Sequence, residues 1–170
     1  ASYYQIAPAN DIMIMRHNQQ WRSDVSTEVY AQAGVIPYRH DSNGRLEILL
    51  IRRIDKEKWG IPKGLIDPGV TPRETARAEA IEEAGVVGTL SEQPVGFFSF
   101  NKKEWDAMVH VTVFLLRVTE VQPEYPEQYR REREWFPFNT AVEVAGRKGL
   151  RELILDVPKL IKEHLPETNE

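Results

Sequence analysis

Residues 64–86 read GLIDPGVTPRETARAEAIEEAGV, a glycine and proline loop that leads into a helix with well-marked ends. Thr71 and Glu74 form the pattern of a capping box, with a proline between them at the first helical position. Such a cap pairs amide groups that the helix itself leaves free. Gly85 stands where a left-handed residue commonly ends a helix. The sequence therefore predicts a helix over residues 72–84.

Three glutamates, Glu79, Glu82 and Glu83, are the chemically distinctive residues of this helix. Their i, i+3, i+4 spacing places them on one face, while Ala80 and Ala84 can pack on a sheet. Without a cation the three carboxylates repel each other, whereas a hard divalent ion such as Mg²⁺ prefers carboxylate oxygens. Taken alone, the spacing favours the simpler interpretation of a solvent-facing acidic stripe.

The residues before the loop favour a metal site over a solvent-facing acidic stripe. The run RRIDKEKWGIPK, residues 52–63, holds five cations against two acids. Hydrolysis of a phosphoanhydride needs a metal, a carboxylate that deprotonates water, and cations that hold the remaining phosphates. All three ingredients lie within residues 52–83, so we interpret the acidic face as a metal site. In this arrangement Gly64 would let the backbone approach the metal, and Lys63 would reach a phosphate.

The bulk composition predicts one globular domain. The chain has 170 residues, of which 41% are hydrophobic and 28% charged, and it has no cysteine and a formal net charge of −4. This charge argues against bulk nucleic-acid binding, and no apolar run is long enough to predict a membrane span. We expect a cytoplasmic protein without a signal peptide. Residues 1–26 are expected to be an irregular leader, residues 27–165 a single domain and residues 166–170 a tail.

Turn residues and β-branched or aromatic residues predict the remaining elements. A final amphipathic helix is expected over residues 150–165, although Pro158 argues against its continuity. The order of the elements predicts an α/β domain whose mixed sheet is covered by helices. The other elements are strands over 27–39 and 45–53, joined by a turn at 41–44, strands over 95–100, 108–121 and 134–138, and a short helix over 140–145 capped by Asn139.

The stretch that begins at Gly64 resembles the Nudix box, which runs glycine, five residues, glutamate, seven residues, then Arg-Glu-apolar-any-Glu-Glu-any-Gly-apolar. The spacing matches throughout, but Val70 stands at the position of the box glutamate and Ala78 at that of the arginine. In the family these two side chains are thought to pair and to brace the loop against the helix. Losing both leaves no unpaired charge. The resemblance implies a Nudix-like α/β/α sandwich with a mixed central sheet.

Three further segments are similar to one branch of this family, the diphosphoinositol polyphosphate and diadenosine polyphosphate hydrolases. They read WGIPKG at residues 59–64, VTEV at residues 118–121 and REWF at residues 133–136. With the hairpin, the resemblance covers roughly residues 28–145.

The resemblance implies roles for particular residues. Glu79 and Glu83 are the expected ligands of Mg²⁺ or Mn²⁺, and Glu82 is either a third ligand or the base that activates water. The carbonyl of Lys63 is expected as a further ligand, and Gly64 and Gly85 are structural. Phosphate contacts are expected from Lys63, Arg52, Arg53 and Arg39, and with less weight from Arg131 and Arg133. For each arginine, a surface charge or a salt bridge is an equally good interpretation.

Aromatic and histidine side chains allow two interpretations each. Trp59, Phe98 and Tyr129 could stack on a base, although Trp59 equally suits packing of the loop on the core. His110 lies in an apolar strand and is interpreted as a satisfied interior residue, and His40 as a surface residue. No Ser/His/Asp or Cys/His grouping indicates a covalent mechanism, so we expect direct attack by metal-activated water.

The predicted activity is hydrolysis of a phosphoanhydride in a small anionic substrate, either a diphosphoinositol polyphosphate or a dinucleoside polyphosphate. One alternative is an RNA 5′-end pyrophosphohydrolase, against which the net charge of −4 counts. Another is a non-catalytic nucleotide-binding module, suggested by Val70 and Ala78. A merely structural domain with a solvated acidic helix would show no effect of metal on stability.

Overall fold

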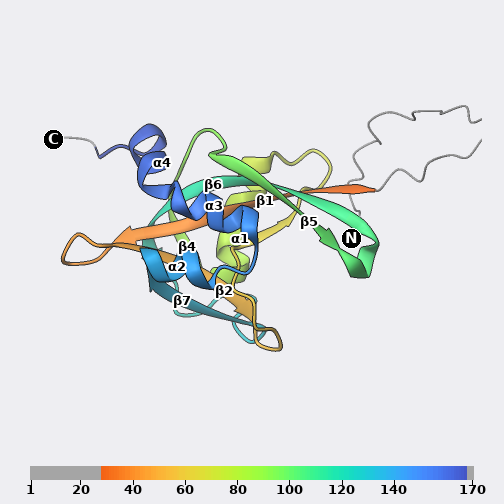
Figure 1. Cartoon of the computed structure of the whole chain (residues 1–170), viewed down its shortest axis with the longest axis horizontal. Helices are drawn as coiled ribbons and strands as arrows, with labels where there is room; N and C mark the ends of the chain where they lie inside the picture. Colours follow the sequence, from red (N-terminus) through yellow and green to blue (C-terminus); the bar gives the residue numbers. More distant parts are fainter. Residues whose placement is uncertain (1–27, 168–170) are drawn as a thin grey trace, which may run out of the picture.

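The structure is a computed structural model that describes residues 28–167, so most of the expected leader and part of the expected tail lie outside the described residues. Its strands form one seven-stranded mixed sheet in the order β4-β6-β1-β2-β7, with β3 beside β1 and β5 beside β6 (Figure 1). The strands are β1 (Val29–His40), β2 (Leu46–Arg53), β3 (Lys63–Leu65), β4 (Val86–Leu90), β5 (Gly96–Lys102), β6 (Ala107–Val121) and β7 (Arg131–Pro137). The helices are α1 (Pro72–Ala84), α2 (Phe138–Val144), α3 (Lys148–Leu155) and α4 (Val157–His164), and a 3-10 turn, η1, covers Lys103–Trp105.

The sheet is mixed because β1 runs parallel to β6, whereas β1 runs antiparallel to β2 and β3. Both neighbours lie on the same edge of β1. Its first half pairs with β3, where Gly34 is opposite Lys63, and its second half pairs with β2, where Tyr38 is opposite Ile48. The chain between β2 and β3 therefore leaves the sheet at the middle of β1, and this is where the basic run lies.

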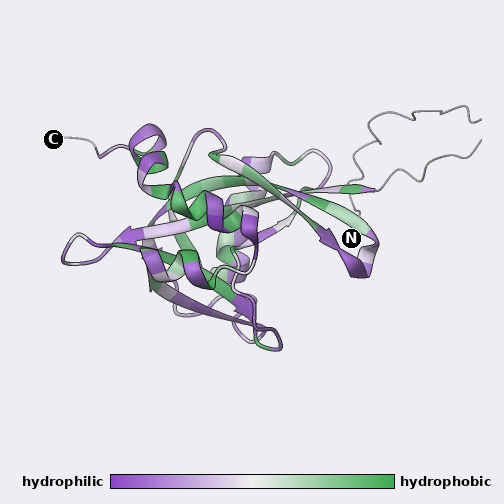
Figure 2. Cartoon of the chain, viewed as in Figure 1, coloured by the Kyte–Doolittle hydropathy of each residue, from purple (hydrophilic) through white to green (hydrophobic). Residues whose placement is uncertain are grey.

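Each face of the sheet buries its own core, because alternate residues of a strand point to opposite sides. On β1, Val35 packs in the core that includes Ala76 and Ala80 of α1. Ile36 packs in the other core, with Ile154 among the residues contributed by α2, α3 and α4. Figure 1 shows α2 and α3 on the near side and α1 behind the strands, and Figure 2 shows hydrophobic residues along the central strands. The expected α/β architecture with a mixed sheet between helices is confirmed.

The predicted C-terminal helix is wrong in one respect, because it is two helices, α3 and α4, that meet at Asp156. Pro158 lies in the first turn of α4, where its missing N–H costs nothing, and it cannot continue the preceding helix. Asn139 does not cap α2, which begins at Phe138 with Pro137 at the cap position and no side-chain cap. The structure also contains β3 and β4, which the sequence did not predict as strands.

Candidate active site

The helix α1 begins and ends where the sequence predicts. The Thr71 hydroxyl accepts a hydrogen bond from the Glu74 amide at 3.1 Å, and the Glu74 carboxylate accepts one from the Thr71 amide at 2.9 Å. Gly85 ends the helix with φ 61°, a left-handed conformation that glycine adopts without steric cost. The capping box and the glycine stop are therefore both present.

Two arginines anchor α1 to the sheet in the absence of the usual brace. Val70 and Ala78 are exposed and bring no charge to the helix. At the first turn, Arg73 donates hydrogen bonds to the main-chain oxygens of Leu90 at 3.1 Å and Ser91 at 3.0 Å. The N-terminal end of the helix is thereby tied to the end of β4.

Arg133 performs the same task at the last turn of α1. Its guanidinium donates to the main-chain oxygens of Ala84 at 2.7 Å and Gln122 at 2.8 Å, and it lies 4.4 Å from the centre of the Tyr125 ring. A Cβ at Gly85 would approach that guanidinium and ring to within 2.8 Å. Arg133, expected as a phosphate contact, is instead engaged in holding the end of the helix.

The three glutamates do not form a uniformly solvent-facing stripe. Glu82 is exposed, Glu79 is half-buried, and Glu83 is buried with 7% of its surface accessible. No hydrogen bond or ion pair with a residue of the described range 28–167 satisfies the Glu79 carboxylate. Burial, together with the nearby charges of Glu83 and Glu82, raises the pKa of Glu79 to about 8. The interpretation as a solvated acidic face does not hold for Glu79 and Glu83.

Gly64 makes room for the Glu79 carboxylate. A Cβ added at residue 64 would collide with both carboxylate oxygens and with the carbon between them. The glycine that opens the box therefore lets the carboxylate lie directly against the backbone of β3, beside Lys63.

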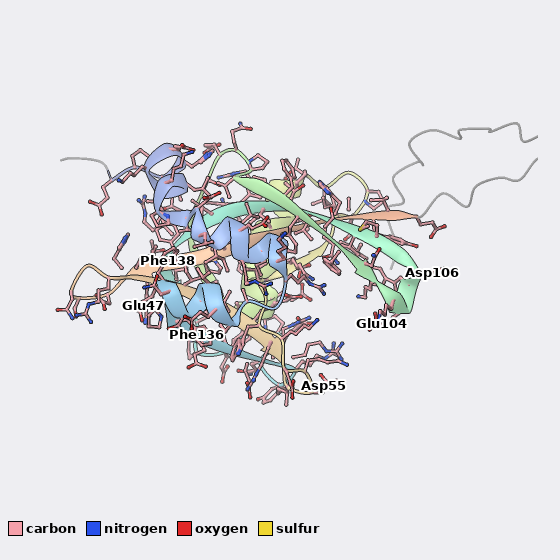
Figure 3. The ribbon with its side chains drawn as sticks, viewed as in Figure 1. Glu47, Asp55, Glu104, Asp106, Phe136 and Phe138 are labelled. Carbon is pink, nitrogen blue, oxygen red and sulfur yellow. The ribbon has the colours of Figure 1, made fainter. Side chains whose placement is uncertain are left out.

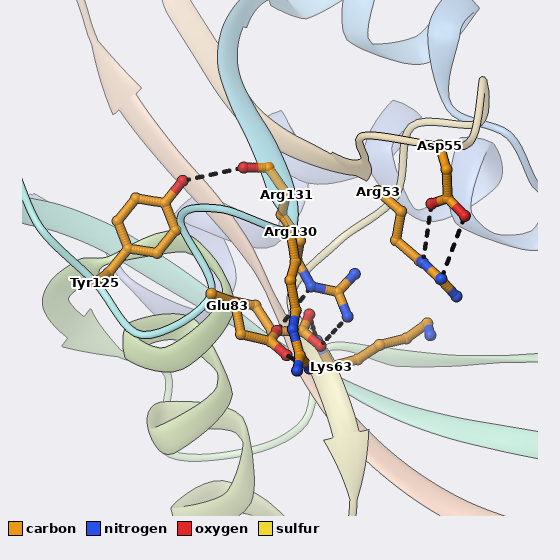
Figure 4. A network of polar contacts seen from close by, with 8 residues as sticks. Arg53, Asp55, Lys63, Glu83, Tyr125, Arg130 and Arg131 are labelled. Carbon is orange, nitrogen blue, oxygen red and sulfur yellow. Dashed lines mark hydrogen bonds and ion pairs between the residues drawn. The ribbon is translucent and has the colours of Figure 1, made fainter.

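Glu83 has partners from two elements. The backbone N–H of Lys63 donates to its carboxylate at 3.2 Å, and Arg131 at the start of β7 forms an ion pair with it at 3.0 Å (Figure 4). Burial nevertheless raises the pKa of Glu83. Arg131 also donates to the carboxylate of Glu127 at 2.8 Å, and the Glu127 amide donates to the main-chain oxygen of Glu82 at 3.0 Å. A fourth carboxylate, Glu127, thus joins the group.

The carboxylates of Glu79, Glu82 and Glu83 are the kind of ligand that a hard divalent cation prefers, but they are not yet arranged around one point. Within the described part of the chain, no three acidic, histidine or cysteine side chains already surround a common point. Glu83 is held by Arg131, so it must exchange this partner to serve as a ligand. Glu79, by contrast, is a partly buried carboxylate that forms no ion pair with residues 28–167. A donor set of carboxylates on one helix beside the glycine loop fits Mg²⁺ or Mn²⁺.

Lys63, Lys102 and Arg147 form a cation cluster beside the rings of Phe100 and Trp105. The Lys63 ammonium is 5.1 Å and the Arg147 guanidinium 3.5 Å from the centre of this ring, and the Lys102 ammonium is 3.6 Å from that of Trp105. Among the ion pairs of residues 28–167, none involves these three cations. Burial lowers the pKa of each of them, and Arg147 lowers further the pKa of both lysines.

The other arginines predicted to contact phosphate, Arg53, Arg52 and Arg39, lie at different distances from the cation cluster. Arg53 pairs with Asp55 at 3.3 Å close to Arg131 (Figure 4), and its charge lowers the pKa of Lys102, which places it near the cluster. Arg52 pairs with Glu132 at 2.6 Å and lies 4.6 Å from the centre of the Trp59 ring. Arg39 pairs with Glu47 at 2.9 Å, and Figure 3 shows Glu47 and Asp55 well apart. Arg39 therefore lies apart from Arg53 and the cation cluster.

Of the three aromatic side chains considered for base stacking, two belong to the core. Trp59 packs edge-on against Phe136 with ring centres 4.9 Å apart, and Phe98 is only 5% exposed. Tyr129 is 83% exposed. His110 is half-buried rather than interior, with Nδ1 3.0 Å from the Ser99 hydroxyl.

Sequence reasoning missed Glu127, Lys102 and Arg147. The first lies in the connection between β6 and β7, the second at the end of β5 and the third just before α3. Their approach to Lys63 and Glu83 depends on strand pairing and on the connection between helices. No spacing pattern in the sequence carries that information.

Comparison with known proteins agrees with this geometry. Residues 31–157 match the sequence model of the NUDIX domain. Nudix hydrolase 12, mitochondrial, from Arabidopsis thaliana is 30% identical over 149 residues, which are 77% of this chain and 73% of that protein. Diphosphoinositol polyphosphate phosphohydrolase 3-alpha from Mus musculus is 34% identical over 90 residues, 52% of each chain.

Among solved structures, an Ap4A hydrolase from C. elegans in a binary complex has the same fold. Its TM-score is 0.64 at 22% identity, and the match covers 79% of this chain and 98% of that one. Over residues 28–167, no helix is both long and apolar enough to cross a membrane. With the family match over residues 31–157, these findings show that the chain belongs to the Nudix family and is a hydrolase of the pyrophosphohydrolase type.

Proposed function

We propose that this chain hydrolyses a phosphoanhydride bond in a small, highly anionic substrate, with Mg²⁺ or Mn²⁺ held by Glu79, Glu83, Glu82 and the carbonyl of Lys63. The observation that carries the proposal is the partly buried Glu79 carboxylate, which forms no ion pair with residues 28–167. Its neighbour Glu83 interacts with Lys63, one of three clustered cations that also form no ion pair within this range. One half of this arrangement attracts a cation and the other half attracts an anion. A phosphate substrate with its metal supplies both.

The carboxylates have distinct parts in this proposal. A divalent ion, when bound, neutralises phosphate oxygens and lowers the pKa of its water. Glu79 lies against β3 through the gap at Gly64, and Glu83 is presented beside the Lys63 amide. Exposed Glu82 is free to serve as a third ligand or to take the proton from the attacking water. Glu127 shares Arg131 with Glu83, so it can keep that guanidinium in place when Glu83 turns to the metal.

The cations orient and neutralise the substrate. Lys63, Lys102 and Arg147 come from three parts of the chain, and none of them forms an ion pair within residues 28–167. Such a cluster favours a substrate with several phosphates beyond those at the metal. Arg53, at the border of this cluster, is a further contact. Arg52 has a weaker claim, since it already holds Glu132.

The substrate proposed is a dinucleoside polyphosphate or a diphosphoinositol polyphosphate. Both are polyanions, and both appear in the names of the proteins that the chain resembles in sequence or in fold. An RNA 5′-end pyrophosphohydrolase is the second candidate, but the net charge of −4 disfavours broad RNA affinity. We also propose a cytoplasmic location, because a chain without cysteine suits a reducing compartment, although the A. thaliana relative is named mitochondrial.

The test is a substrate panel assayed with the full chain. Diadenosine tetraphosphate, a diphosphoinositol pentakisphosphate and a triphosphorylated RNA are incubated with increasing Mg²⁺ in ¹⁸O-labelled water, and products are identified by ³¹P NMR. We expect metal-dependent cleavage with the label in one phosphate product, and a fall in kcat of about 100-fold or more in Glu83→Gln. Absence of turnover, with a nucleotide still raising Tm, would instead support a non-catalytic binding module.

A further inference from the structure

A surface cleft of about 480 Å³ opens beside Arg131, the residue that pairs with the Glu83 carboxylate. One wall comes from the end of β2 and the residues after it, with Arg53 and Ile54, and the other from the loop before β7, with Tyr129 and Arg130. Glu127 and Arg131 also line the cleft, and Arg131 is the residue that holds Glu83 at 3.0 Å. Arg131 therefore connects the cleft to the Glu83 carboxylate of the proposed metal site.

The walls of this cleft carry two large apolar side chains that face solvent. Tyr129 is 83% exposed and Ile54 is 58% exposed. For Tyr129 no stacked ring, cation or hydrogen-bond partner exists among residues 28–167. Exposed apolar surface inside a cleft that adjoins a catalytic site is typical of a ligand contact.

The backbone around Tyr129 fixes this wall. The amide of Ile54 donates to the Arg130 oxygen at 3.0 Å, and the amide of Arg130 donates to the Glu127 oxygen at 2.9 Å. The two walls are thus joined by a main-chain hydrogen bond, and Tyr129 projects from a turn. Its exposure follows from the hydrogen-bonded path of the loop.

The charges of the cleft favour an anion next to the apolar surface. Arg53 is paired with Asp55, and Arg130 approaches Glu127 at 3.8 Å, so both guanidinium groups are held at the walls. With Arg131 the lining contains three cations and two acids. A ligand that suits this surface has a flat apolar ring joined to a phosphate.

We propose that the cleft binds the nucleobase half of a nucleoside polyphosphate, with the base stacked on Tyr129, Ile54 contacting its edge and the adjoining phosphate directed toward Arg131. This inference rests on the proposed function and selects one of its two proposed substrate classes. A base has a planar face that an aromatic ring can stack on, and stacking tolerates any base. A fully phosphorylated inositol ring presents no such face. The preferred substrate class is therefore the dinucleoside polyphosphate.

The experiment compares Tyr129→Ala, Tyr129→Phe and the wild-type chain on diadenosine tetraphosphate and on a diphosphoinositol pentakisphosphate. We expect Tyr129→Ala to raise KM for the dinucleotide by about tenfold with little change in kcat, and Tyr129→Phe to resemble wild type, because the ring does the stacking. Phe97→Ala removes another exposed aromatic ring, 56% exposed on β5, and serves as the matched control with unchanged KM.

The possible failures are separable. An unchanged KM in Tyr129→Ala, or turnover of the diphosphoinositol substrate alone, overturns the cleft assignment and leaves the hydrolase proposal standing. If the wild-type chain cleaves no substrate, the hydrolase proposal fails, and binding of AMP with Mg²⁺ followed by NMR decides the inference. Upfield ring-current shifts of the adenine protons that vanish in Tyr129→Ala support it, and identical spectra overturn it.

Discussion

The carboxylate of Glu79 occupies the space that a side chain at Gly64 would need. Gly64 has no left-handed φ, so the requirement for glycine here is one of space and not of backbone conformation. This relationship joins the first residue of the loop to the middle of α1. The position of the carboxylate relative to β3 therefore depends on the absence of a single methyl group.

Gly64→Ala tests that dependence. The added methyl group must displace the Glu79 carboxylate, and a shift of about 1 Å in a catalytic group can reduce kcat about 100-fold. We expect a loss of this size in a folded protein, measured by steady-state kinetics and by circular dichroism. Gly60→Ala is the matched control, because a Cβ at Gly60 meets no atom within 4 Å and the φ of that residue is not left-handed. Equal rates in the two variants would contradict the prediction.

Glu79→Gln tests the role of the unpaired carboxylate in metal binding. In EDTA the variant should melt higher than wild type, because it replaces a partly buried carboxyl group whose ionisation is disfavoured by burial and by its acidic neighbours. A gain of about 1 kcal/mol corresponds to roughly 2–4 °C for a domain of this size. Adding Mg²⁺ should raise the Tm of wild type and have much less effect on the variant. Differential scanning calorimetry with and without Mg²⁺ gives both numbers.

A control distinguishes metal binding from a general effect of negative charge. Glu74 forms the capping box on the same helix but lies away from the three glutamates. Glu74→Gln should lower the Tm slightly through the weakened cap while keeping the full Mg²⁺ response. A Mg²⁺ response that survives in Glu79→Gln would remove Glu79 from the set of ligands.

The sequence predicted local features of the site correctly because local chemistry specifies them. Thr71, Glu74 and Gly85 mark the ends of α1, and their hydrogen bonds and φ value depend on residues at most five positions away. By contrast, the extent of β7 and the existence of β3 depend on partners far along the chain. Lys63 pairs with Gly34, and no periodicity in three residues could have identified that strand.

Long-range contacts also decide which arginines belong to the site. Arg131 and Arg133 are two residues apart on β7, yet only the first reaches Glu83 while the second holds the end of α1. Arg39 seemed as suitable as Arg53 in the sequence, and the structure places it beside Glu47 and over Trp135. A cation is identified as such by the sequence, but its partner is identified only by the fold.

Arg133→Met tests whether this arginine positions the helix or contacts the substrate. Loss of two charge-assisted hydrogen bonds to the Ala84 and Gln122 oxygens should destabilise the protein by about 2 kcal/mol. Because α1 then loses its anchor at the glutamate end, kcat should fall while KM for the substrate changes little. Kinetics below the melting transition measure both parameters. Arg45→Met, at an exposed position after the β1–β2 turn, is the control and should leave both unchanged.

A rise in KM with an unchanged kcat would contradict this role and restore Arg133 as a phosphate contact. Arg133→Lys adds a further check. A lysine cannot donate to both oxygens in the fixed geometry of a guanidinium, so it should recover only part of the lost kcat.

Lys102→Gln separates stability from substrate binding in the cation cluster. Burial lowers the pKa of Lys102, Glu104 opposes this, and Arg53 and Arg147 lower it further. A lysine with a lowered pKa costs the folded state stability wherever it is charged, and the cost disappears as the pH rises past its ordinary value of 10.5. The variant should therefore melt higher than wild type at pH 7, and this difference in Tm should vanish as the pH rises past 10.5. The KM for a polyphosphate substrate should rise about fivefold, because about 1 kcal/mol of binding free energy is lost.

Lys159→Gln on α4, whose lysine already pairs with Glu163, is the control and should change neither Tm nor KM. If Lys102→Gln melted lower at pH 7 and kept the wild-type KM, Lys102 would be a supporting residue of the β5–β6 turn and not a cation held for the substrate.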